Sequence, residues 1–543
     1  MAGTVTTDLA FFTGATGGSS AADAITDWTG TGLVLDTVAF VQGTGSIYTY
    51  SAPTTTSRLA DFACTSTSIE NKVIYFWFAL GKVGFLDTKA AGGLRLRVED
   101  ASANYGEWYI AGSDTLPHNG FICHAVHTSI TFDAQSATAP DKAAITKICV
   151  RAYGSFPGKA YTWVDAVRAG TYLQIKAGTE ASPATLGDLY TAEQTVANQW
   201  GVLSKIGGIY FVQGQLFIGS TTAAEDTYFK DTSQVVVFKN ALIPSGFYEI
   251  KVQGNSTATT QKVFFGNKSG TAGIQGVSFR CESGSQTPKF KFTTTDTYVT
   301  DLGVYGSGFV AADTISLPAY STTREVLNTS FESCAEVLPN TCIVTNCNFI
   351  SSSARAIRIS SASHNVTSSN FISCQTAIHH DVGGATESHL KYDYNALKFT
   401  GGTYHIENSA VTPNYYIDIN RLNGSNPDPA KIYNSNGGST TLLEIGVPLE
   451  INGVKTGTEP SNYVRCRIEK QSDNSTIMNQ EAQTSYGTEG FYKATMSYSY
   501  TADVPVRVRA RYKGYLPFES TGTITSGGLT VTAVWQADPN YTP

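Results

Sequence analysis

Short apolar runs separated by polar turns recur along the whole chain, and their patterns predict strands rather than helices. The run at 71–80, NKVIYFWFAL, is apolar on both alternating faces, which is typical of a central strand covered on both sides. The run at 94–99, LRLRVE, alternates apolar and charged residues, as a half-solvated strand does. These patterns predict that residues 1–172 form a jelly-roll or lectin-like β-sandwich.

The stretch that closes this first segment, YTWVDAVRAGTYLQI at 161–175, also alternates. Successive side chains of a strand point to opposite faces of its sheet. The pattern therefore places Trp163, Asp165 and Val167 on one face, and Val164 and Ala166 on the other.

Three tryptophans of the first segment, Trp77, Trp108 and Trp163, are candidates for a sugar-binding surface, because exposed aromatic and amide side chains suit sugars. In a sandwich, however, large aromatic residues belong to the core more often than to a ligand platform. Core positions are therefore expected for all three.

From 173 to 431 the chain repeats itself. NTSFESCAE, NCNFISSSARAI and SSNFISCQTAI match when Phe331, Phe349 and Phe371 are superposed, with gaps of 18 and 22 residues. Repeats of this length indicate stacked units, each burying its apolar side chains against its neighbours. The unit is strand, turn, strand without a helical portion, which favours a right-handed parallel β-helix. A leucine-rich-repeat horseshoe is the alternative, but its dense leucine pattern is missing.

Two details of the repeats carry further expectations. Asn recurs at the same place in successive repeats, where stacked side chains could form a ladder. Ser and Cys recur where the interior corners of a coil would be tight, and small side chains fit there.

The last segment, 432–543, contains five strand candidates and predicts an Ig-like or transthyretin-like β-sandwich. In the candidate strand 504–512, Arg507, Arg509 and Arg511 alternate with apolar residues. Such a row is typical of a solvated face or of a contact between subunits, and an anion-binding site is the alternative.

Composition supports an all-β chain. Only 15% of the 543 residues are charged, while Gly (51), Tyr (29) and Phe (27) are frequent, which suits pleated sheets joined by many turns. The net charge of −7 comes without a basic run, so nucleic acid is not an expected partner. The nine cysteines form no CxxC pair, so buried free thiols are expected instead of disulfides or a zinc site.

No apolar run reaches the roughly 18 residues that a membrane-spanning helix needs. The first residues, MAGTVTTDLAFFTGATGG, lack the basic segment and apolar core of a signal peptide. We therefore expect a protein that is assembled inside a cell and carried out on a particle.

Candidate chemistry is sparse. Between Val337 and His380 there is no Asp or Glu, whereas glycoside hydrolysis needs a pair of carboxyl groups. His379, His380 and Asp381, with Glu387, His389 and Asp393 nearby, could supply a base or metal ligands. Their spacing matches no defined motif and favours a polar turn. No catalytic, cofactor-binding or metal-binding residue is assigned, and no cofactor is expected.

Several segments resemble virion proteins of tailed bacteriophages: GEWYIAGSDTLP at 106–117, YTWVDAVRAG at 161–170 and WGVLSKIGGIYFVQGQLFIG at 200–219. The end of the chain, with VPVRVRARYKGYLPF and GLTVTAVWQAD, resembles the small β-sandwich modules that finish such proteins. The resemblance implies a lectin-like sandwich followed by a pectate-lyase-like β-helix, and a component of the virion. It supplies no catalytic residues.

This resemblance leads us to expect a non-enzymatic structural protein on the outer surface of capsid or tail: a tail fibre, a tailspike-like appendage or a capsid decoration with a role in host attachment. Other virion proteins and a host-surface glycan are the expected partners. A homo-oligomer, with a trimer as the first choice, would cover exposed strand edges. Two alternatives remain: a depolymerase of the β-helix type and a carbohydrate-binding adhesin.

Overall fold

The computed structural model describes residues 3–541 except for these segments: 31, 51–54, 159, 180, 194–201, 222–224, 231–234, 239–247, 256–260, 267, 269–275, 282–289, 295–300, 319–323, 383–387, 410–414, 436–437, 445–446, 455–463, 482–491, 501 and 526. The chain divides into two compact units, residues 1–358 and residues 359–543. Nearly all of the regular structure is strand, so the predicted all-β class is confirmed.

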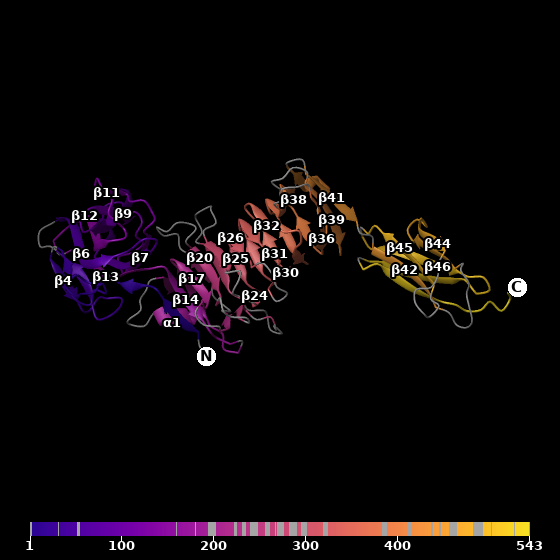
Figure 1. The fold of residues 1–543 in the computed structure, drawn as a ribbon, viewed down its shortest axis with the longest axis horizontal. Helices are drawn as coiled ribbons and strands as arrows, with labels where there is room; N and C mark the ends of the chain where they lie inside the picture. Colours follow the sequence, from indigo (N-terminus) through magenta and orange to yellow (C-terminus); the bar gives the residue numbers. More distant parts are fainter. Residues whose placement is uncertain are drawn as a thin grey trace. The chain divides into compact units, whose positions relative to one another are not determined.

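The first unit begins with two six-stranded antiparallel sheets that face each other across a core of buried apolar residues. Figure 1 shows them as the indigo and violet part of the chain. The first sheet has the order β10 (Ile122–His127), β7 (Val73–Leu80), β13 (Thr162–Gly170), β5 (Ser46–Thr49), β4 (Leu33–Asp36), and β2 (Ala10–Phe11) pairs with β13. The second has the order β11 (Ala134–Gln135), β9 (Tyr105–Ala111), β8 (Leu94–Asp100), β12 (Ile145–Phe156), β6 (Thr55–Thr67), β3 (Trp28–Thr29).

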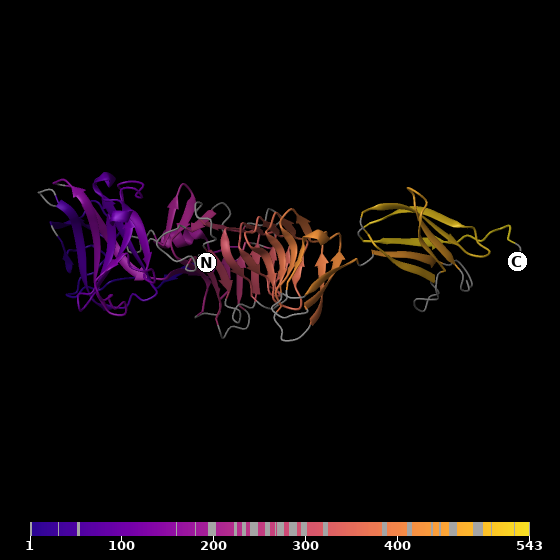
Figure 2. The same ribbon diagram turned by 90° about the horizontal axis from the view of Figure 1, so that it is seen from above.

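After this sandwich the strands visit three parallel sheets in turn, because each strand pairs in parallel with the strand three places further on. Figures 1 and 2 show the strands of each sheet lying side by side. In the first unit the first sheet contains β14 (Tyr172–Lys176), β17 (Gln215–Gly219), β20 (Tyr248–Gln253), β23 (Phe290–Thr294), β26 (Ala312–Ser316), β29 (Glu336–Leu338) and β32 (Arg355–Ile359).

The second parallel sheet contains β16 (Ile209–Val212), β19 (Val235–Phe238), β22 (Ser278–Cys281), β25 (Gly308–Val310), β28 (Ser330–Glu332) and β31 (Asn348–Ile350). The third contains β18 (Thr227–Phe229), β21 (Lys262–Phe265), β24 (Asp301–Tyr305), β27 (Glu325–Leu327) and β30 (Ile343–Thr345). Two antiparallel strands, β1 (Thr4–Thr7) and β15 (Leu203–Ile206), pair with β14 and β16. A helix, α1 (Leu186–Glu193), lies in this region, where the sequence pattern predicted none.

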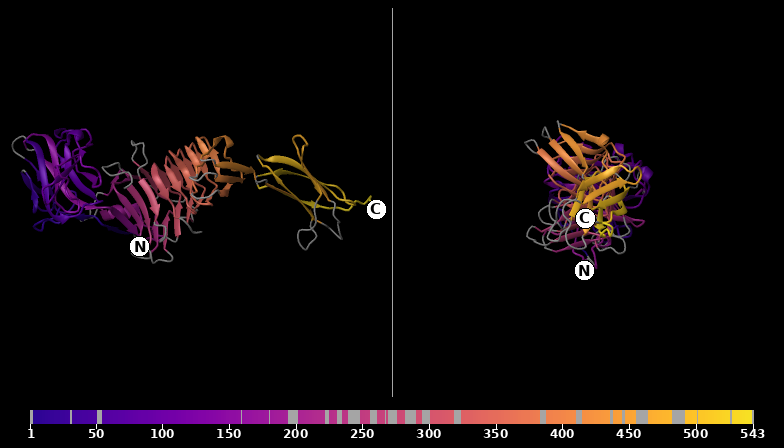
Figure 3. Two further views of the ribbon diagram at one scale, coloured as in Figure 1. Left: turned by 45° about the horizontal axis from the view of Figure 1, so that its top comes forward. Right: turned by 90° about the vertical axis from the view of Figure 1, so that its right-hand side faces the viewer.

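The second unit continues the same three-strand alternation and ends in a sandwich, shown in yellow in Figure 3. The alternating strands are β33 (Asn365–Thr367), β34 (Asn370–Ile372), β35 (Thr376–His380), β36 (Ser388–Asn395), β37 (Lys398–Thr400), β38 (Tyr404–Asn408), β39 (Tyr415–Leu422), β40 (Ile432–Asn434) and β41 (Ser439–Glu444). The sandwich pairs a sheet of β45 (Tyr492–Tyr498), β42 (Val447–Val454) and β48 (Leu529–Val534) with a sheet of β44 (Thr476–Glu481), β43 (Arg465–Lys470), β46 (Val504–Arg511) and β47 (Phe518–Ile524). The boundaries at 172/173 and 431/432 stay predictions. Parallel pairing continues to β41, although β40 and β41 pair with β38 and β39, only two places back.

The repeated phenylalanines stack as the superposition requires within each unit. The ring centroids of Phe331 and Phe349 lie 4.8 Å apart with an interplanar angle of 9°, and Phe309 stacks on Phe331 at 5.4 Å. In the second unit Phe371 stacks on Phe399 at 5.1 Å. All five residues are buried, so each of these coils contributes an aromatic ring to the core.

From β25 onward, each described short strand of the second sheet is bounded by two corner residues with a positive φ, five positions apart. The pairs are Gly306 and Ala311, Asn328 and Ser333, Asn346 and Ser351 in the first unit, and Ser368 and Ser373, Ala396 and Gly401 in the second. The N–H of a corner residue donates to a carbonyl of the next coil, as Asn328 does to Thr345 and Ser333 to Ile350. The ladder of hydrogen bonds therefore continues around the corner.

These corners explain why Asn and Ser recur there. Asn tolerates the left-handed backbone conformation better than most residues, and its backbone N–H bonds to the next coil. The ladder of stacked Asn side chains stays a prediction. Small residues that point inward follow several of these corners: Thr329, Cys347, Cys334 and Ser352 are all buried. Leu397, after Ala396, is a larger buried residue. The expectation that Ser and Cys fill interior corners is confirmed.

Eight of the nine cysteines are buried, Cys123 is half-buried, and all are free thiols. Within the described part of the chain, no helix is long and apolar enough to cross a bilayer. Nor do three or more His, Cys, Asp or Glu side chains meet there in a group that could hold a metal ion.

Candidate functional site

Four half-buried aromatic side chains gather on the outer face of the first sheet of the N-terminal sandwich. They are Tyr48 and Tyr50 at β5, and Tyr161 and Trp163 at β13, and we call them the aromatic platform. The ring centroid of Tyr161 lies 5.5 Å from that of Tyr48 and 5.8 Å from those of Tyr50 and Trp163. None of the four belongs to the buried core.

The strand register brings these rings together. Trp163 is the direct cross-strand partner of Tyr48 in the antiparallel pair of β13 and β5. The neighbours Ile47 and Val164 point the other way into the core, so both aromatic residues must face outward. Tyr50 and Tyr161 lie two positions from these partners and therefore share their face. The platform is a set of cross-strand aromatic pairs on a solvent-facing sheet.

A carboxylate is fixed at the edge of the platform. Asp36, at the end of β4, accepts a hydrogen bond from Trp163 Nε1 at 2.9 Å through Oδ2, and from the backbone N–H groups of Val38 (2.8 Å) and Ala39 (3.1 Å) through Oδ1. Partial burial acts to raise the pKa of Asp36, but these three hydrogen bonds outweigh it and hold the pKa below its ordinary value. Asp36 is therefore a permanent acceptor that also fixes the indole ring.

The platform carries hydrogen-bond donors as well. Burial, followed by the neighbouring Tyr50, Tyr161 and Asp36, raises the pKa of Tyr48, so its hydroxyl keeps its proton at neutral pH. Exposed apolar residues lie around the platform: Val34 is the cross-strand partner of Tyr48 and is 37% exposed, and Val38 is 90% exposed. A flat apolar surface with fixed polar groups at its rim suits a ligand with one apolar face and several hydroxyl groups.

The expectation that the three tryptophans are core residues is right for one of them. Trp108 is fully buried and its Nε1 donates to the Ile130 carbonyl at 3.0 Å. Trp163 and Trp77 are half-buried on the outer face of their sheet. The tripeptides YTY at 48–50 and YTW at 161–163 were the signal that could have predicted this, since both place aromatic residues two apart around a buried Thr.

The predicted alternation around Asp165 is wrong. A β-bulge interrupts β13 between Asp165 and Arg168, and Ala166 takes a positive φ of 50°. As a result Asp165, Ala166 and Val167 are all buried. A bulge inserts an extra residue into a strand and shifts the following side chains to the other face, which alternation alone does not predict.

The histidine cluster lies in a strand and not in the predicted polar turn. His379 and His380 are the last residues of β35, and both are buried. His380 Nε2 lies 2.8 Å from the Tyr394 hydroxyl, and burial holds the pKa of His380 well below its ordinary value. His379 Nε2 bonds to the Ser409 hydroxyl. Glu387 and the side chain of His389 lie outside the described residues. Buried imidazoles in a core strand support packing rather than catalysis.

Two carboxylates that do lie close together occupy the outer face of the second sheet of the N-terminal sandwich. The guanidinium of Arg97 contacts Glu99 at 2.7 Å and Glu107 at 3.4 Å. Burial acts to raise the pKa of Glu99, but the hydrogen bond and charge of Lys147, with the charges of Arg97 and Arg151, outweigh it and lower the pKa. A carboxylate held in its charged form cannot donate the proton that a general acid needs.

Comparisons with known proteins give no family. No family profile matches the chain, and no curated protein is significantly similar to it. Among solved structures, an exo-β-agarase shares 9% identity over 26% of this chain and 23% of its own, with a TM-score of 0.21. A "Family 16 Carbohydrate Binding Module-2" shares 11% identity over 26% of this chain and 89% of its own, with a TM-score of 0.15. The chain thus spans less than a quarter of the agarase.

Proposed function

We propose that this protein is a non-enzymatic, surface-displayed structural protein that binds a glycan through the aromatic platform of its first sandwich. The observation that carries the proposal is the half-exposed cluster of Tyr48, Tyr50, Tyr161 and Trp163 around the fixed carboxylate of Asp36. Aromatic rings stack on the apolar face of a sugar ring, while the carboxylate and the tyrosine hydroxyls are placed to bond its hydroxyl groups.

The fold that goes with this function is a lectin-like jelly roll, a right-handed parallel β-helix and an Ig-like sandwich, in that order along the chain. The three-sheet alternation and the stacked phenylalanines support the β-helix. The two facing sheets of the final segment support the Ig-like module. Stacked coils joined by continuous hydrogen-bond ladders form a stiff rod, which is what a displayed spacer needs.

The proposed location is the outer surface of a phage particle, as a tail fibre, a tailspike-like appendage or a capsid decoration. Support comes from the sequence resemblance to tailed-phage virion proteins. Other virion proteins would hold one end, and the host glycan would meet the platform. A homotrimer remains the proposed assembly, since it would cover open strand edges. Immunogold labelling of intact particles tests the location, and labelling absent from every particle would exclude it.

The depolymerase alternative is less well supported by the acids that can be described. Glu99 and Glu107 lie close together, but each is held in an ion-pair network. Incubating the full-length protein with capsular polysaccharide or lipopolysaccharide and assaying new reducing ends or unsaturated uronates tests this point. Release of either product would replace the non-enzymatic proposal with the depolymerase.

The glycan-binding proposal is tested with two truncations, Trp163→Ala and Tyr48→Ala. Each is expected to weaken binding roughly tenfold or more, because truncating an aromatic residue at the centre of an interface costs on the order of 2 kcal/mol. Binding is measured by glycan array with the full chain, followed by calorimetry on the best glycan. Asp36→Asn keeps the shape of the side chain and should lose affinity by a smaller factor.

Tyr541→Ala is the control, because Tyr541 is an exposed tyrosine (38%) in the other unit. It is expected to bind as the wild type does. Unchanged binding by Trp163→Ala, with circular dichroism showing an intact fold, would contradict the proposal.

A second candidate for the same face is docking to another virion protein. Val38 at 90% exposure and Phe40 at 39% are large apolar residues open to solvent next to the platform, and such patches often mark protein contacts. Val38→Ser and Phe40→Ser distinguish the two. Loss of assembly into particles with unchanged glycan binding would assign this edge to docking.

A further inference from the structure

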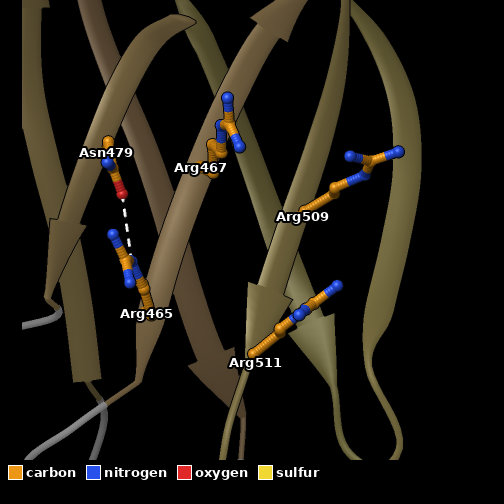
Figure 4. Close-up of a pocket in the computed structure, with 5 residues that line it drawn as sticks. All are labelled: Arg465, Arg467, Asn479, Arg509 and Arg511. Carbon is orange, nitrogen blue, oxygen red and sulfur yellow. Dashed lines mark hydrogen bonds between the residues drawn. The ribbon is translucent and has the colours of Figure 1, made fainter.

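The C-terminal sandwich has a hollow of about 240 Å³ whose walls are almost entirely arginine. Its lining residues are Arg465, Arg467, Asn479, Arg509 and Arg511. They come from three adjacent strands, β43, β44 and β46, of the sheet with the order β44-β43-β46-β47. Figure 4 shows the four guanidinium groups along β43 and β46, with Asn479 beside Arg465.

The strand register places the arginines directly opposite one another. Arg465 pairs with Arg511, and Arg467 pairs with Arg509, in the antiparallel ladder of β43 and β46. Like charges directly opposite each other on a sheet destabilise it. Two consecutive pairs of this kind form a square of four positive charges. Such an arrangement needs compensation from negative charge.

Within the sheet, carboxylates of the protein lie against only one pair of these arginines, Arg467 and Arg509. Glu469 contacts Arg467 at 2.7 Å and Arg509 at 3.2 Å, and it is buried. Glu519 contacts Arg509 and also Arg507, each at 3.2 Å. The inner pair, Arg467 and Arg509, is therefore partly neutralised by carboxylates of the protein.

Among the side chains that the structure describes, none neutralises the outer pair, Arg465 and Arg511. Arg465 donates from Nε to the neutral amide of Asn479 at 3.2 Å, and neither Arg465 nor Arg511 forms an ion pair with a described side chain. Glu481 holds the register position across from Arg465 on β44. Both arginines are exposed, so a ligand can approach them from solvent. Their guanidinium groups keep donors free at the open end of the hollow.

From this lining we propose that the hollow is a binding site for a tetrahedral oxyanion, a sulfate or phosphate group, bound by Arg465 and Arg511. Guanidinium groups bind such anions through paired N–H donors in a fixed fork. A sulfate or phosphate group offers an oxygen to donors on either strand, whereas a carboxylate offers only two oxygens. The site is separate from the aromatic platform and does not depend on the function proposed for it.

Hydrogen–deuterium exchange of the full chain tests the site through peptides that cover β43 and β46. Millimolar sulfate, added at constant ionic strength, should slow exchange in these peptides. At ten times the dissociation constant the slowing should be about tenfold, because an anion that binds only the closed state stabilises it by mass action. Phosphate should act like sulfate, and acetate should protect much less. Equal protection by acetate would overturn the tetrahedral assignment.

The double variant Arg465→Gln, Arg511→Gln should lose the sulfate effect. Without sulfate its peptides should exchange more slowly than those of the wild type, because the repulsion has been removed. Arg507→Gln is the matched control: it removes one charge from the same row, outside the hollow, and should keep the effect. Faster exchange in the double variant without sulfate would show that the two arginines only hold the sheet together, and would overturn the proposal.

Peptides from β8 and β12 serve as an internal control, since sulfate stabilises many proteins by exclusion from their surface. Equal slowing in those peptides would overturn the assignment to the hollow. Dextran sulfate compared with neutral dextran then identifies the source of the anion. Protection by dextran sulfate supports an ester on a polymer, and protection by the inorganic ions alone supports a free anion; both support the site.

Discussion

Both sandwiches place a row of arginines on the face of a sheet, and the two faces differ in the carboxylates that accompany them. On the second sheet of the N-terminal sandwich, the cations are Arg95, Arg97, Lys147 and Arg151, and the acids are Asp61, Glu99 and Glu107. Every one of these seven side chains forms an ion pair. On the C-terminal sheet there are five arginines, and Glu469 and Glu519 pair with three of them: Arg467, Arg507 and Arg509.

The N-terminal arginines also stack on rings. The Arg95 guanidinium lies 4.1 Å from the ring centroid of Tyr153 and 4.6 Å from that of Tyr109, and Arg97 lies 3.6 Å from Tyr105. One face is therefore a closed network in which each charge is satisfied, and the other keeps unused positive charge. The difference teaches that a row of alternating arginines becomes structural or ligand-binding according to the acids that the fold brings to it.

The largest expected effect comes from removing a carboxylate of the closed network. Glu99→Gln should lower the free energy of unfolding by about 3 kcal/mol, because Glu99 is buried and its loss leaves Arg97 and Lys147 short of a partner. Glu519→Gln is the matched change on the C-terminal sheet, where Glu519 is exposed, and should cost less than about 1 kcal/mol. Urea unfolding measures both losses. Hydrogen–deuterium exchange of peptides from each sheet shows which sandwich unfolds in each transition. Equal losses would remove the distinction between the two faces.

Acid should destabilise the closed network, because it protonates Glu99. The folded-state pKa of Glu99 is lowered, so its contribution to stability is present above the ordinary Glu pKa and is lost as the pH falls through the lower, folded value. The unfolding free energy of the wild type should therefore fall more steeply in acid than that of Glu99→Gln. A parallel decline of the two would contradict the assignment.

A smaller effect is expected from Asp165, a carboxylate of the same sandwich that forms no ion pair with a described side chain. It is fully buried and accepts from the N–H groups of Val41 and Gln42 at 2.7 and 3.2 Å. Burial raises its pKa to about 7, which these hydrogen bonds only partly oppose. The folded state then holds a proton between about pH 4 and pH 7 that the unfolded state has released, so stability falls as the pH rises through this window.

Asp165→Asn should remove this slope and raise the free energy of unfolding at pH 8, on the order of 2 kcal/mol, because an amide needs no desolvated charge and its oxygen still accepts both hydrogen bonds. Thermal unfolding between pH 5 and pH 8 measures the effect. A variant with the same slope as the wild type would show that Asp165 does not titrate in this window.

The smallest expected effect is that of salt on the C-terminal sheet. Screening weakens repulsion between exposed charges, so sodium chloride should raise the local stability of β43 and β46 by less than about 1 kcal/mol. Hydrogen–deuterium exchange in these two strands should slow accordingly. The same salt should leave the closed network of β8 and β12 unchanged or slightly weaker. A uniform response of both sheets would show that their charges are balanced alike.

The sequence predicts the two arginine-bearing strands, but not which carboxylates accompany the arginines on each sheet. LRLRVE at 94–99 and VPVRVRAR at 504–511 both read as half-solvated strands, and both are. The acids that distinguish them come from far along the chain: Asp61, which pairs with Arg151, lies 90 residues away from it. Pairing of that kind depends on strand register, which alternation within a strand does not fix.

The aromatic platform could not be predicted for the same reason, because it also depends on strand register. Each pair of aromatic residues is visible in the sequence, but Tyr48 and Trp163 become neighbours only through the register of β5 and β13. The stacked coils were easier to predict, because a repeated Phe in sequence becomes a repeated Phe in space when each unit packs on the one before it. The bulge at Asp165 and the helix α1 left no periodic signal of this type.

The five-residue step between corner residues has a consequence for how chains of this type can change in length. The step is constant in all five pairs, from Gly306 and Ala311 to Ala396 and Gly401, whereas the path from one pair to the next varies. An added residue inside the step would push a buried Phe to the wrong side of the wall, while one on the return path only enlarges a loop. Insertions and deletions among natural variants should therefore collect along the return paths and leave this one wall of the coil unaltered.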